Sequence, residues 1–235
     1  MQLFYTENIN EEISLTKEEN RHLIKVLRKN VGDKINIING NGFLFITEIT
    51  EIKKNTTSLK VIKKEKKEKQ HKYNLHLAIA PTKNINRFEW FLEKATEIGI
   101  NEITPVICSR SERKKINLER CNKIIISAIK QSIKYYKPKL NSPMSFIDFI
   151  NKEHKGEKHI THCLDKKKHR ITKSDNLSHT ILIGPEGDFS ESEISQAIDK
   201  SFKPLTLGNS RLRTETAGVV ATQTLNLLFE WFFLI

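Results

Sequence analysis

The chain has 235 residues, which suits one small domain and one of medium size rather than two large ones. Hydrophobic residues make up 37% of the sequence and 12 residues are phenylalanine, so packed cores are expected and a disordered chain is excluded. Lys and Arg outnumber Asp and Glu by 40 to 28, and the formal net charge of +12 favours a polyanionic partner such as nucleic acid. A general drift of the composition towards lysine is the alternative source of this charge.

The cysteines and the two termini indicate the compartment. Cys108, Cys121 and Cys163 form no CxxC pair, which excludes a disulfide framework and predicts a reducing, cytoplasmic location. The first residues show no basic segment followed by an apolar stretch, so no secretory signal is expected. The apolar run 225–235 is interrupted by polar residues and is too short to span a bilayer. We expect it to be the buried end of a helix, and it also suits a homodimer contact.

The first third of the chain predicts a helix followed by strands. Residues 16–29 have a helical pattern, with Thr16 as the N-cap and Glu19 completing a capping box. Residues 39–42, Asn-Gly-Asn-Gly, form a hairpin turn signal because these residue types tolerate positive φ. The strands expected around this turn are 35–38, 43–49 and 58–62. Strands at this spacing predict a small β-barrel of about 65 residues.

A change of pattern divides the chain into two predicted domains, 1–68 and 73–235. The run 63–72 has no apolar residue, so we expect a linker or a solvated arm, with an RNA-contacting arm as the alternative. Beyond it, strand and helix patterns alternate, which predicts an α/β domain with a largely parallel sheet. The expected strands are 75–80, 103–107, 158–164, 180–183 and 204–207, and the expected helices are 86–98, 117–134, 191–200 and 214–230.

The first candidate loop, Gly-Pro-Glu-Gly-Asp at 184–188, directly follows an apolar strand. Ser190 and Glu193 form a capping box that begins the next helix. Open α/β sheets bind ligands at such strand ends, where glycines leave the backbone accessible. The loop matches neither dinucleotide nor phosphate-loop patterns, and Glu186 and Asp188 suit a cation, such as a sulfonium, better than a phosphate. A tight strand–helix turn, with its acids at a helix N-terminus, is the purely structural alternative.

The second candidate loop places Arg211 and Arg213 just before a helix that begins near Thr214. Positive charge is unfavourable at a helix N-terminus, so an anionic partner is expected, either Glu215 or an RNA phosphate. A local salt bridge to Glu215 is the alternative without a functional role. Small residues allow this helix to pack closely on a neighbour: Ala217, Gly218 and Ala221.

Both loops resemble known signatures. Residues 183–190, IGPEGDFS, and 207–217, LGNSRLRTETA, closely resemble the paired motifs of the bacterial ribosomal RNA uridine-N3 methyltransferases, the RsmE-type family of the SPOUT superfamily. Residues 93–99 with Pro105 resemble the central helix of that family. The motifs cover nearly the whole chain, because two further segments also match: 110–113, and 21–28 with Gly32 and Asp33.

The resemblance implies a PUA-like RNA-binding β-barrel followed by a SPOUT α/β domain whose chain threads a trefoil knot, a rare exception to unknotted topology. It implies a homodimer that uses S-adenosylmethionine to methylate N3 of a uridine in 16S rRNA, in free small-subunit RNA or in the 30S subunit. A bent cofactor would contact mainly backbone of two segments: Leu182, Ile183, Gly184, Pro185, Glu186, Gly187, Leu207, Gly208, Asn209, Ser210, Arg211, Leu212 and Arg213.

Uracil N3 must lose its proton and face the methyl group, so a catalyst that stabilises the uracil anion is expected. Arg213 is the first candidate and Arg211 the second, with Glu215 or a water accepting the proton. The target uridine must be unpaired or extruded from a helix. Two positions depart from the family pattern. Many members have arginine where this chain has Ser210, and Lys134 replaces a common arginine, which keeps the charge but loses bidentate geometry.

Contacts to the RNA backbone are expected from basic residues, although a solvated charge is the alternative at each position. The candidates are Arg21, His22, Lys25, Arg28, Arg110, Arg113 and Lys134. No metal is expected, because His159, His162 and Cys163 match no zinc spacing.

Two other functions stay open. One is a non-enzymatic RNA-binding ribosome assembly factor, which the glycines of both loops argue against. The other is a SPOUT methyltransferase that acts on a ribose 2′-OH or on tRNA.

Overall fold

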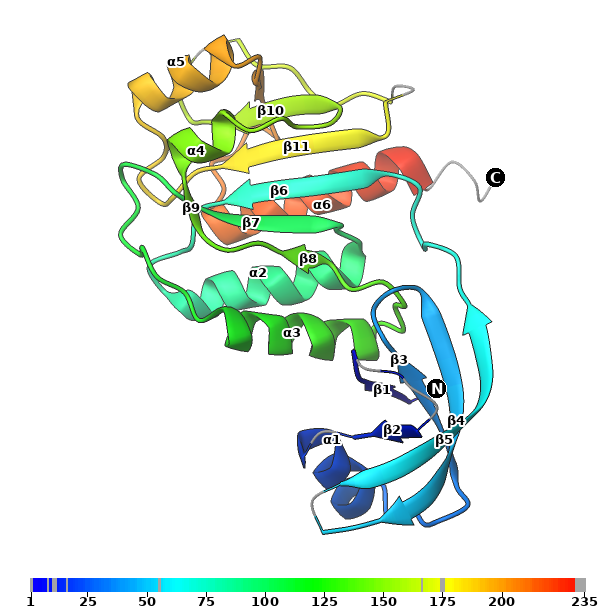
Figure 1. Cartoon of the computed structure of the whole chain (residues 1–235). Coiled ribbons are helices and arrows are strands. Elements are labelled where there is room, and N and C mark those ends of the chain that lie inside the picture. The colour runs from blue at the N-terminus through cyan, green and yellow to red at the C-terminus, as the bar shows by residue number, and fades with distance from the viewer. Residues whose placement is uncertain are drawn as a thin grey trace. The chain divides into compact units, whose positions relative to one another are not determined.

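The computed structural model describes residues 2–7, 9, 12–15, 17–54, 56–165, 167–173 and 176–230 (Figure 1). The chain divides into two compact units. The first unit joins residues 1–70 with 126–137, and the second joins 71–125 with 138–235. Residues 126–137 therefore pack with the first unit, although they lie within the sequence of the second.

The first unit is built on a five-stranded sheet with the order β1-β3-β4-β5-β2, in which only β1 and β3 pair in parallel. The turn between β3 and β4 needs Gly40 and Gly42, whose φ angles are +75° and +83°. Alternating apolar residues of these strands form the core, which includes Ile37, Phe45 and Leu59. The elements are β1 Leu3–Tyr5, β2 Glu12–Ser14, α1 Lys17–Arg21, η1 His22–Val26, β3 Lys34–Ile38, β4 Phe43–Ile52 and β5 Thr57–Lys66.

Two predictions for the first unit are corrected. The helix expected over 16–29 is shorter, because α1 continues into one π-helical turn, η1, and the chain then leaves the helix with Arg28 at φ +51°. The predicted cap, Thr16, lies outside the described residues. The predicted linker begins too early, since β5 runs to Lys66 and pairs with β4 as far as Phe43. Most of its lysines are exposed, with Lys67 half-buried, and Lys64 Nζ lies 4.4 Å from the centre of the Phe43 ring.

The second unit contains a seven-stranded sheet with the order β12-β10-β11-β6-β7-β8, and β9 pairs with β7. Every pairing in it is parallel, which confirms the prediction of an α/β domain. Three short elements were not predicted from the sequence: β8, β9 and α4. The elements are β6 Asn74–Ile79, α2 Ile85–Ile98, β7 Glu102–Ile107, α3 Leu118–Gln131, β8 Lys139–Leu140, β9 Met144–Ser145, α4 Phe146–Ile150, β10 Glu157–Thr161, β11 Ser178–Ile183, α5 Glu191–Asp199, β12 Lys203–Leu205 and α6 Thr214–Glu230.

Two apolar layers bury this sheet. On one face Leu77 and Ile79 of β6 pack in a cluster with Phe91 of α2 and Leu225 of α6. On the other face a separate cluster joins β6 to α4 and α5 through residues that include Ala78, Phe146 and Ile194. Figure 1 shows α2 and α6 beside one face of the sheet, with α4 and α5 beside the other. Alternate residues of β6 thus serve opposite layers, as expected for a central strand.

The strand order indicates where a ligand can bind, at the carboxyl ends of the parallel strands. Neighbouring strands β11 and β7 flank β6, so connections run in opposite directions from the middle of the sheet, where open α/β sheets place their ligands. The loops that follow β10, β11 and β12 all leave the same edge because these strands are parallel. The trefoil knot stays a prediction from the resemblance.

The C-terminal helix buries Leu225 and Phe229, as predicted, and residues 231–235 lie outside the described part. Within the described residues, no helix has both the length and the apolar character that crossing a membrane requires.

Candidate active site

The loop after β11 is a tight turn that hydrogen bonds of Asp188 hold in place. Asp188 adopts φ +64°, and its backbone N–H donates to the carbonyl of Pro185 over 2.9 Å. Its carboxylate accepts hydrogen bonds from the backbone N–H groups of Cys163 and Phe189, each over 2.8 Å. Asp188 therefore joins the loop after β10 to the loop after β11, which is a structural role.

The predicted capping box at the start of α5 is present and extends further. Ser190 accepts from the backbone of Glu193, and the carboxylate of Glu193 accepts in return from the Ser190 backbone. The same carboxylate accepts two hydrogen bonds of 2.8 Å from Ser109. Burial acts to raise the pKa of Glu193, but these hydrogen bonds keep it below its ordinary value.

Two arginines that were predicted to contact RNA donate hydrogen bonds to loop carbonyls, and their contact with RNA stays a prediction. Arg110 Nη1 donates to the Gly187 carbonyl over 2.9 Å. Arg113 donates to the carbonyls of Thr82 over 3.0 Å and of Lys83 over 2.7 Å. The backbone N–H of Lys83 in turn donates to the carboxylate of Glu186 over 2.9 Å. The segment after β7 therefore supports the glycine loop and its neighbour.

The second loop is tied to the first at the start of α6. The hydroxyl of Thr214 is buried and donates to the carbonyl of Gly184 over 3.0 Å. Gly208 has a φ of +142°, which favours glycine, and its carbonyl accepts from Thr206 over 2.9 Å. The bond from Thr214 joins the two glycine loops, and the bond from Thr206 shapes the second loop.

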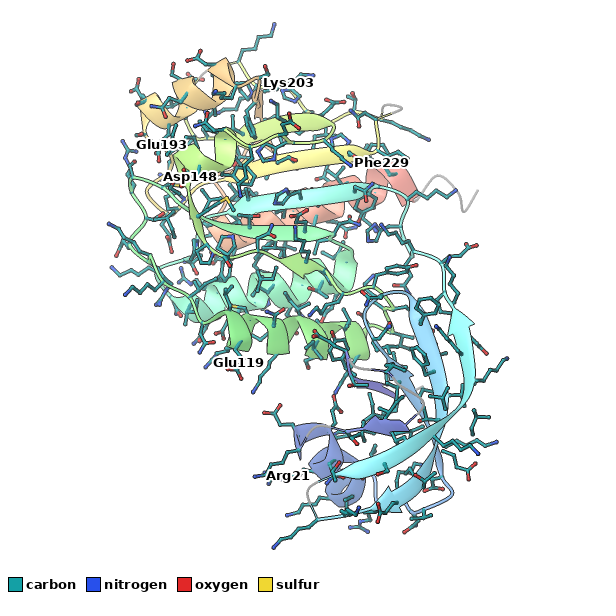
Figure 2. All side chains as sticks on the ribbon, viewed as in Figure 1. Arg21, Glu119, Asp148, Glu193, Lys203 and Phe229 are labelled. Atoms are coloured by element: carbon teal, nitrogen blue, oxygen red, sulfur yellow. The ribbon has the colours of Figure 1, made fainter. Side chains whose placement is uncertain are left out.

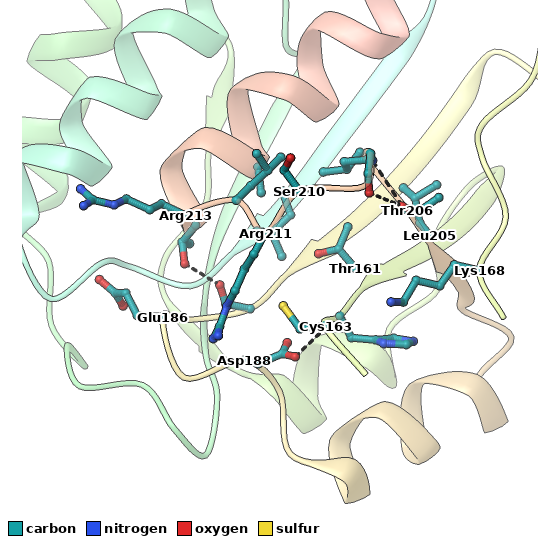
Figure 3. Close-up of a pocket in the computed structure, with 18 of the residues that line it drawn as sticks. Thr161, Cys163, Lys168, Glu186, Asp188, Leu205, Thr206, Ser210, Arg211 and Arg213 are labelled. Carbon is teal, nitrogen blue, oxygen red and sulfur yellow. Dashed lines mark hydrogen bonds between the residues drawn. The ribbon is translucent and has the colours of Figure 1, made fainter. Parts of the chain in front are cut away.

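Between the loops lies a cavity of about 680 Å³, within the usual range for small-molecule sites (Figure 3). The two glycine loops line it, and charged side chains also lie at its wall, including Glu186, Asp188 and Lys168. The lining residues are Thr161, His162, Cys163, Lys168, Ile183, Gly184, Pro185, Glu186, Asp188, Leu205, Thr206, Leu207, Gly208, Asn209, Ser210, Arg211, Leu212, Arg213, Thr214 and Ala217.

Most of the residues predicted to bind cofactor line this cavity, with two exceptions. Leu182 is buried in the layer that faces α4 and α5, and Gly187 packs towards Arg110. Sequence reasoning missed the lining residues after β10, among them Cys163 and Lys168. Their only signal is a position just after a strand, and that strand's place beside β11 and β12 is not visible in the sequence.

The three predicted catalytic residues separate in the structure. Arg211 and Arg213 line the cavity, whereas Glu215 does not. In Figure 3, Arg211 extends across the cavity towards Glu186 and Asp188, while Arg213 points away from them. The Glu215 side chain is 8% exposed, and its Oε1 lies 3.8 Å from Nε of Arg87. The alternative considered above, a local salt bridge between Glu215 and a loop arginine, is not formed, because Glu215 pairs with Arg87 of α2.

Four of the candidate RNA contacts of the first unit lie on one short segment, residues 21–28. Arg21, Lys25 and Arg28 are exposed on or just after α1 and η1, and Figure 2 shows Arg21 at the surface. His22 instead packs edge-on to Phe4, with ring centres 6.0 Å apart.

Lys134 also belongs to the first unit and is half-buried. Burial lowers its pKa, and its ammonium donates to Gln70 Oε1 over 3.3 Å.

His159 is enclosed by other histidines. Its ring nitrogens lie 3.1 Å from His169 Nε2 and 3.2 Å from His179 Nδ1. Burial, helped by the neighbouring rings, lowers the pKa of His159 to about 3, so it is neutral at physiological pH. In the part of the chain that the structure describes, no group of three or more His, Cys, Asp or Glu side chains is placed to hold a metal ion.

Comparison with known proteins identifies the family. An RNA methyltransferase domain family matches residues 46–226, and an RNA methyltransferase PUA domain family matches 15–62. The chain is 30% identical to ribosomal RNA small subunit methyltransferase E of Rickettsia conorii, over 93% of this chain and 91% of the relative.

Solved structures agree with this match. A probable rRNA-methyltransferase from Porphyromonas gingivalis is 36% identical, with a TM-score of 0.91 over 99% of this chain and 100% of that one. The ribosomal RNA small subunit methyltransferase E of Neisseria gonorrhoeae, bound to S-adenosyl methionine, is 26% identical, with a TM-score of 0.84 over 97% and 98%. The chain therefore belongs to the ribosomal RNA small subunit methyltransferase E family of RNA methyltransferases.

Proposed function

We propose that the protein transfers the methyl group of S-adenosylmethionine to N3 of a uridine in 16S rRNA. The observation that carries the proposal is the cavity between the two glycine loops at the carboxyl ends of β10, β11 and β12. Its lining offers backbone groups and apolar side chains for an adenosine, and acids for a cationic centre. We further propose a cytoplasmic homodimer, as the resemblance implies, that acts on free small-subunit RNA or on the 30S subunit.

The residues present fit this cofactor. Leu205, Leu207 and Leu212 give the cavity an apolar side suited to a purine, and the flanking backbone offers hydrogen-bond partners. Glu186 is exposed at the wall, where a carboxylate favours a sulfonium over a neutral thioether. Bound S-adenosylmethionine supplies an activated methyl group to a nucleophilic nitrogen.

The chain's part in the chemistry is to orient the uracil and stabilise its negative charge. Arg211 and Arg213 line the cavity, and neither forms an ion pair with another described residue. A guanidinium that is not neutralised can hold the oxygens of the uracil anion as N3 loses its proton. Glu215 lies outside the cavity, so we assign proton removal to water and give Glu215 the role of fixing the start of α6 through Arg87.

Arg110 provides a test of loop support. Replacing Arg110 with alanine removes the hydrogen bond to the Gly187 carbonyl, and we expect the Kd for S-adenosylmethionine to rise about 3- to 10-fold, as for loss of one exposed charged hydrogen bond. Calorimetric titration measures this change. Lys115→Ala is the matched control, because it removes an exposed charge from the same segment. A variant with normal cofactor affinity but weaker RNA binding would restore the original prediction that Arg110 is an RNA contact.

The substrate class can be tested by methyl transfer in vitro. Purified protein and tritiated S-adenosylmethionine are incubated with unmodified small-subunit rRNA, assembled small subunits, large-subunit rRNA or tRNA. We expect label in the small-subunit RNA, free or assembled, and background in the others. Label in tRNA would contradict the proposal and favour another SPOUT activity. Tight binding to small-subunit RNA without transfer would instead identify an assembly factor.

A further inference from the structure

A lysine outside both glycine motifs reaches the cavity. Lys168 belongs to the segment that follows β10 and returns beside β12. The next residue, His169, fixes this segment, because its N–H donates to the Pro204 carbonyl over 3.1 Å and its carbonyl accepts from Thr206 over 2.9 Å. Lys168 is half-buried, and Figure 3 shows its side chain pointing into the cavity.

The charges of the cavity are arranged on two sides. Glu186 and Asp188 lie on the side of the first glycine loop, and Arg211 extends towards them (Figure 3). Lys168 comes from the opposite wall, and among the described residues it has no ion-pair partner. A half-buried lysine whose ammonium has no counter-ion favours an anionic group of a ligand in this part of the cavity.

We propose that the ammonium of Lys168 binds the α-carboxylate of S-adenosylmethionine. This inference rests on the proposed function and specifies how the site recognises its cofactor. The carboxylate is the anionic group of that molecule, while its sulfonium and α-ammonium are cationic and suit the acidic side of the cavity. An ion pair at the carboxylate thus fixes the methionine end and leaves the adenosine to the apolar side and the loop backbone.

The test compares two ligands that differ only in this carboxylate. S-adenosylmethionine and its decarboxylated form are titrated by calorimetry into the wild-type protein, Lys168→Met and Lys168→Arg. The wild type is expected to bind S-adenosylmethionine about 10-fold more tightly than the decarboxylated ligand, which corresponds to about 1.4 kcal/mol. Lys168→Met should remove this preference, and Lys168→Arg should keep most of it. Lys167→Met, an exposed neighbour that does not line the cavity, should match the wild type.

Several results would overturn the inference. A preference that survives in Lys168→Met would place the carboxylate contact elsewhere, for example at Arg211. An equal loss of affinity for both ligands would show that Lys168 acts through the fold or the general charge of the site. Unchanged cofactor affinity with weaker RNA binding would make Lys168 an RNA contact. A wild-type protein that binds neither ligand would overturn the proposed function itself, which separates that failure from failure of the Lys168 assignment.

Discussion

Replacing Gly184 with valine is expected to raise the Kd for S-adenosylmethionine at least 100-fold, about 2.7 kcal/mol. Gly184 lines the cavity, and a Cβ at this position would lie 3.0 Å from Phe189 Cδ2 and 3.2 Å from the Phe189 backbone nitrogen. Because Phe189 is buried, the added side chain must displace the loop or fill the cavity. The Gly184 carbonyl also accepts a hydrogen bond from Thr214. A displaced first loop would therefore disturb the second glycine loop as well. Calorimetry gives the affinity.

Gly187→Ala is the matched control, since it lies in the same loop but does not line the cavity. Its Cβ would lie 3.3 Å from Arg110 Cβ on an exposed side of the loop. We expect its affinity to stay within a few-fold of the wild type. Circular dichroism should show that both variants fold. A folded Gly184→Val protein with unchanged affinity would place the cofactor outside this cavity.

Substitution of Gly218 is expected to destabilise the second unit although the position is helical. Alanine in a helix is ordinarily about 1 kcal/mol more favourable than glycine. A Cβ on Gly218, however, would lie 2.5 Å from Phe91 Cδ2 and 2.9 Å from Ile79 Cδ1, both in the buried core. Overpacking costs about 1 to 3 kcal/mol, so we expect a net loss of about 1 kcal/mol for Gly218→Ala and about 3 kcal/mol for Gly218→Val.

Urea denaturation followed by circular dichroism measures these losses through the midpoint and slope of the transition. Gln223→Ala, on the same helix, should change the free energy of unfolding by less than about 0.5 kcal/mol. If Gly218→Ala proved more stable than the wild type, α6 could not pack so closely against Phe91 of α2 and Ile79 of β6.

Local patterns were enough to predict most elements of the second unit and both glycine loops. The capping box of Ser190 and Glu193 and the turn at 184–188 depend on neighbouring residues, so the sequence contains all the information that they need. The strands β8 and β9 have two residues each, which is too short for an alternating pattern. The extension of β5 to Lys66 was hidden because its side chains are charged and show no alternation of apolar residues, although its backbone pairs with β4.

The candidate site shows what sequence patterns leave out. Cys163 and Lys168 reach the cavity because β10 lies between β11 and β12, and strand order is a property of the whole sheet. Arg110 was predicted to contact RNA, and nothing near it in the sequence indicates its hydrogen bond to the carbonyl of Gly187, 77 residues away. Glu215 follows Arg213 closely along the chain, but the helix turns its carboxylate towards Arg87. Contacts between distant segments decide these roles.

The most direct test of the central proposal is to identify the methylated nucleoside. Small-subunit RNA that the protein has methylated in vitro is digested to nucleosides and analysed by mass spectrometry beside standards. Our account predicts 3-methyluridine with the wild type and none with Gly184→Val. A methyl group on ribose, or on another base atom, would contradict the proposed reaction while leaving the family and the cofactor cavity in place.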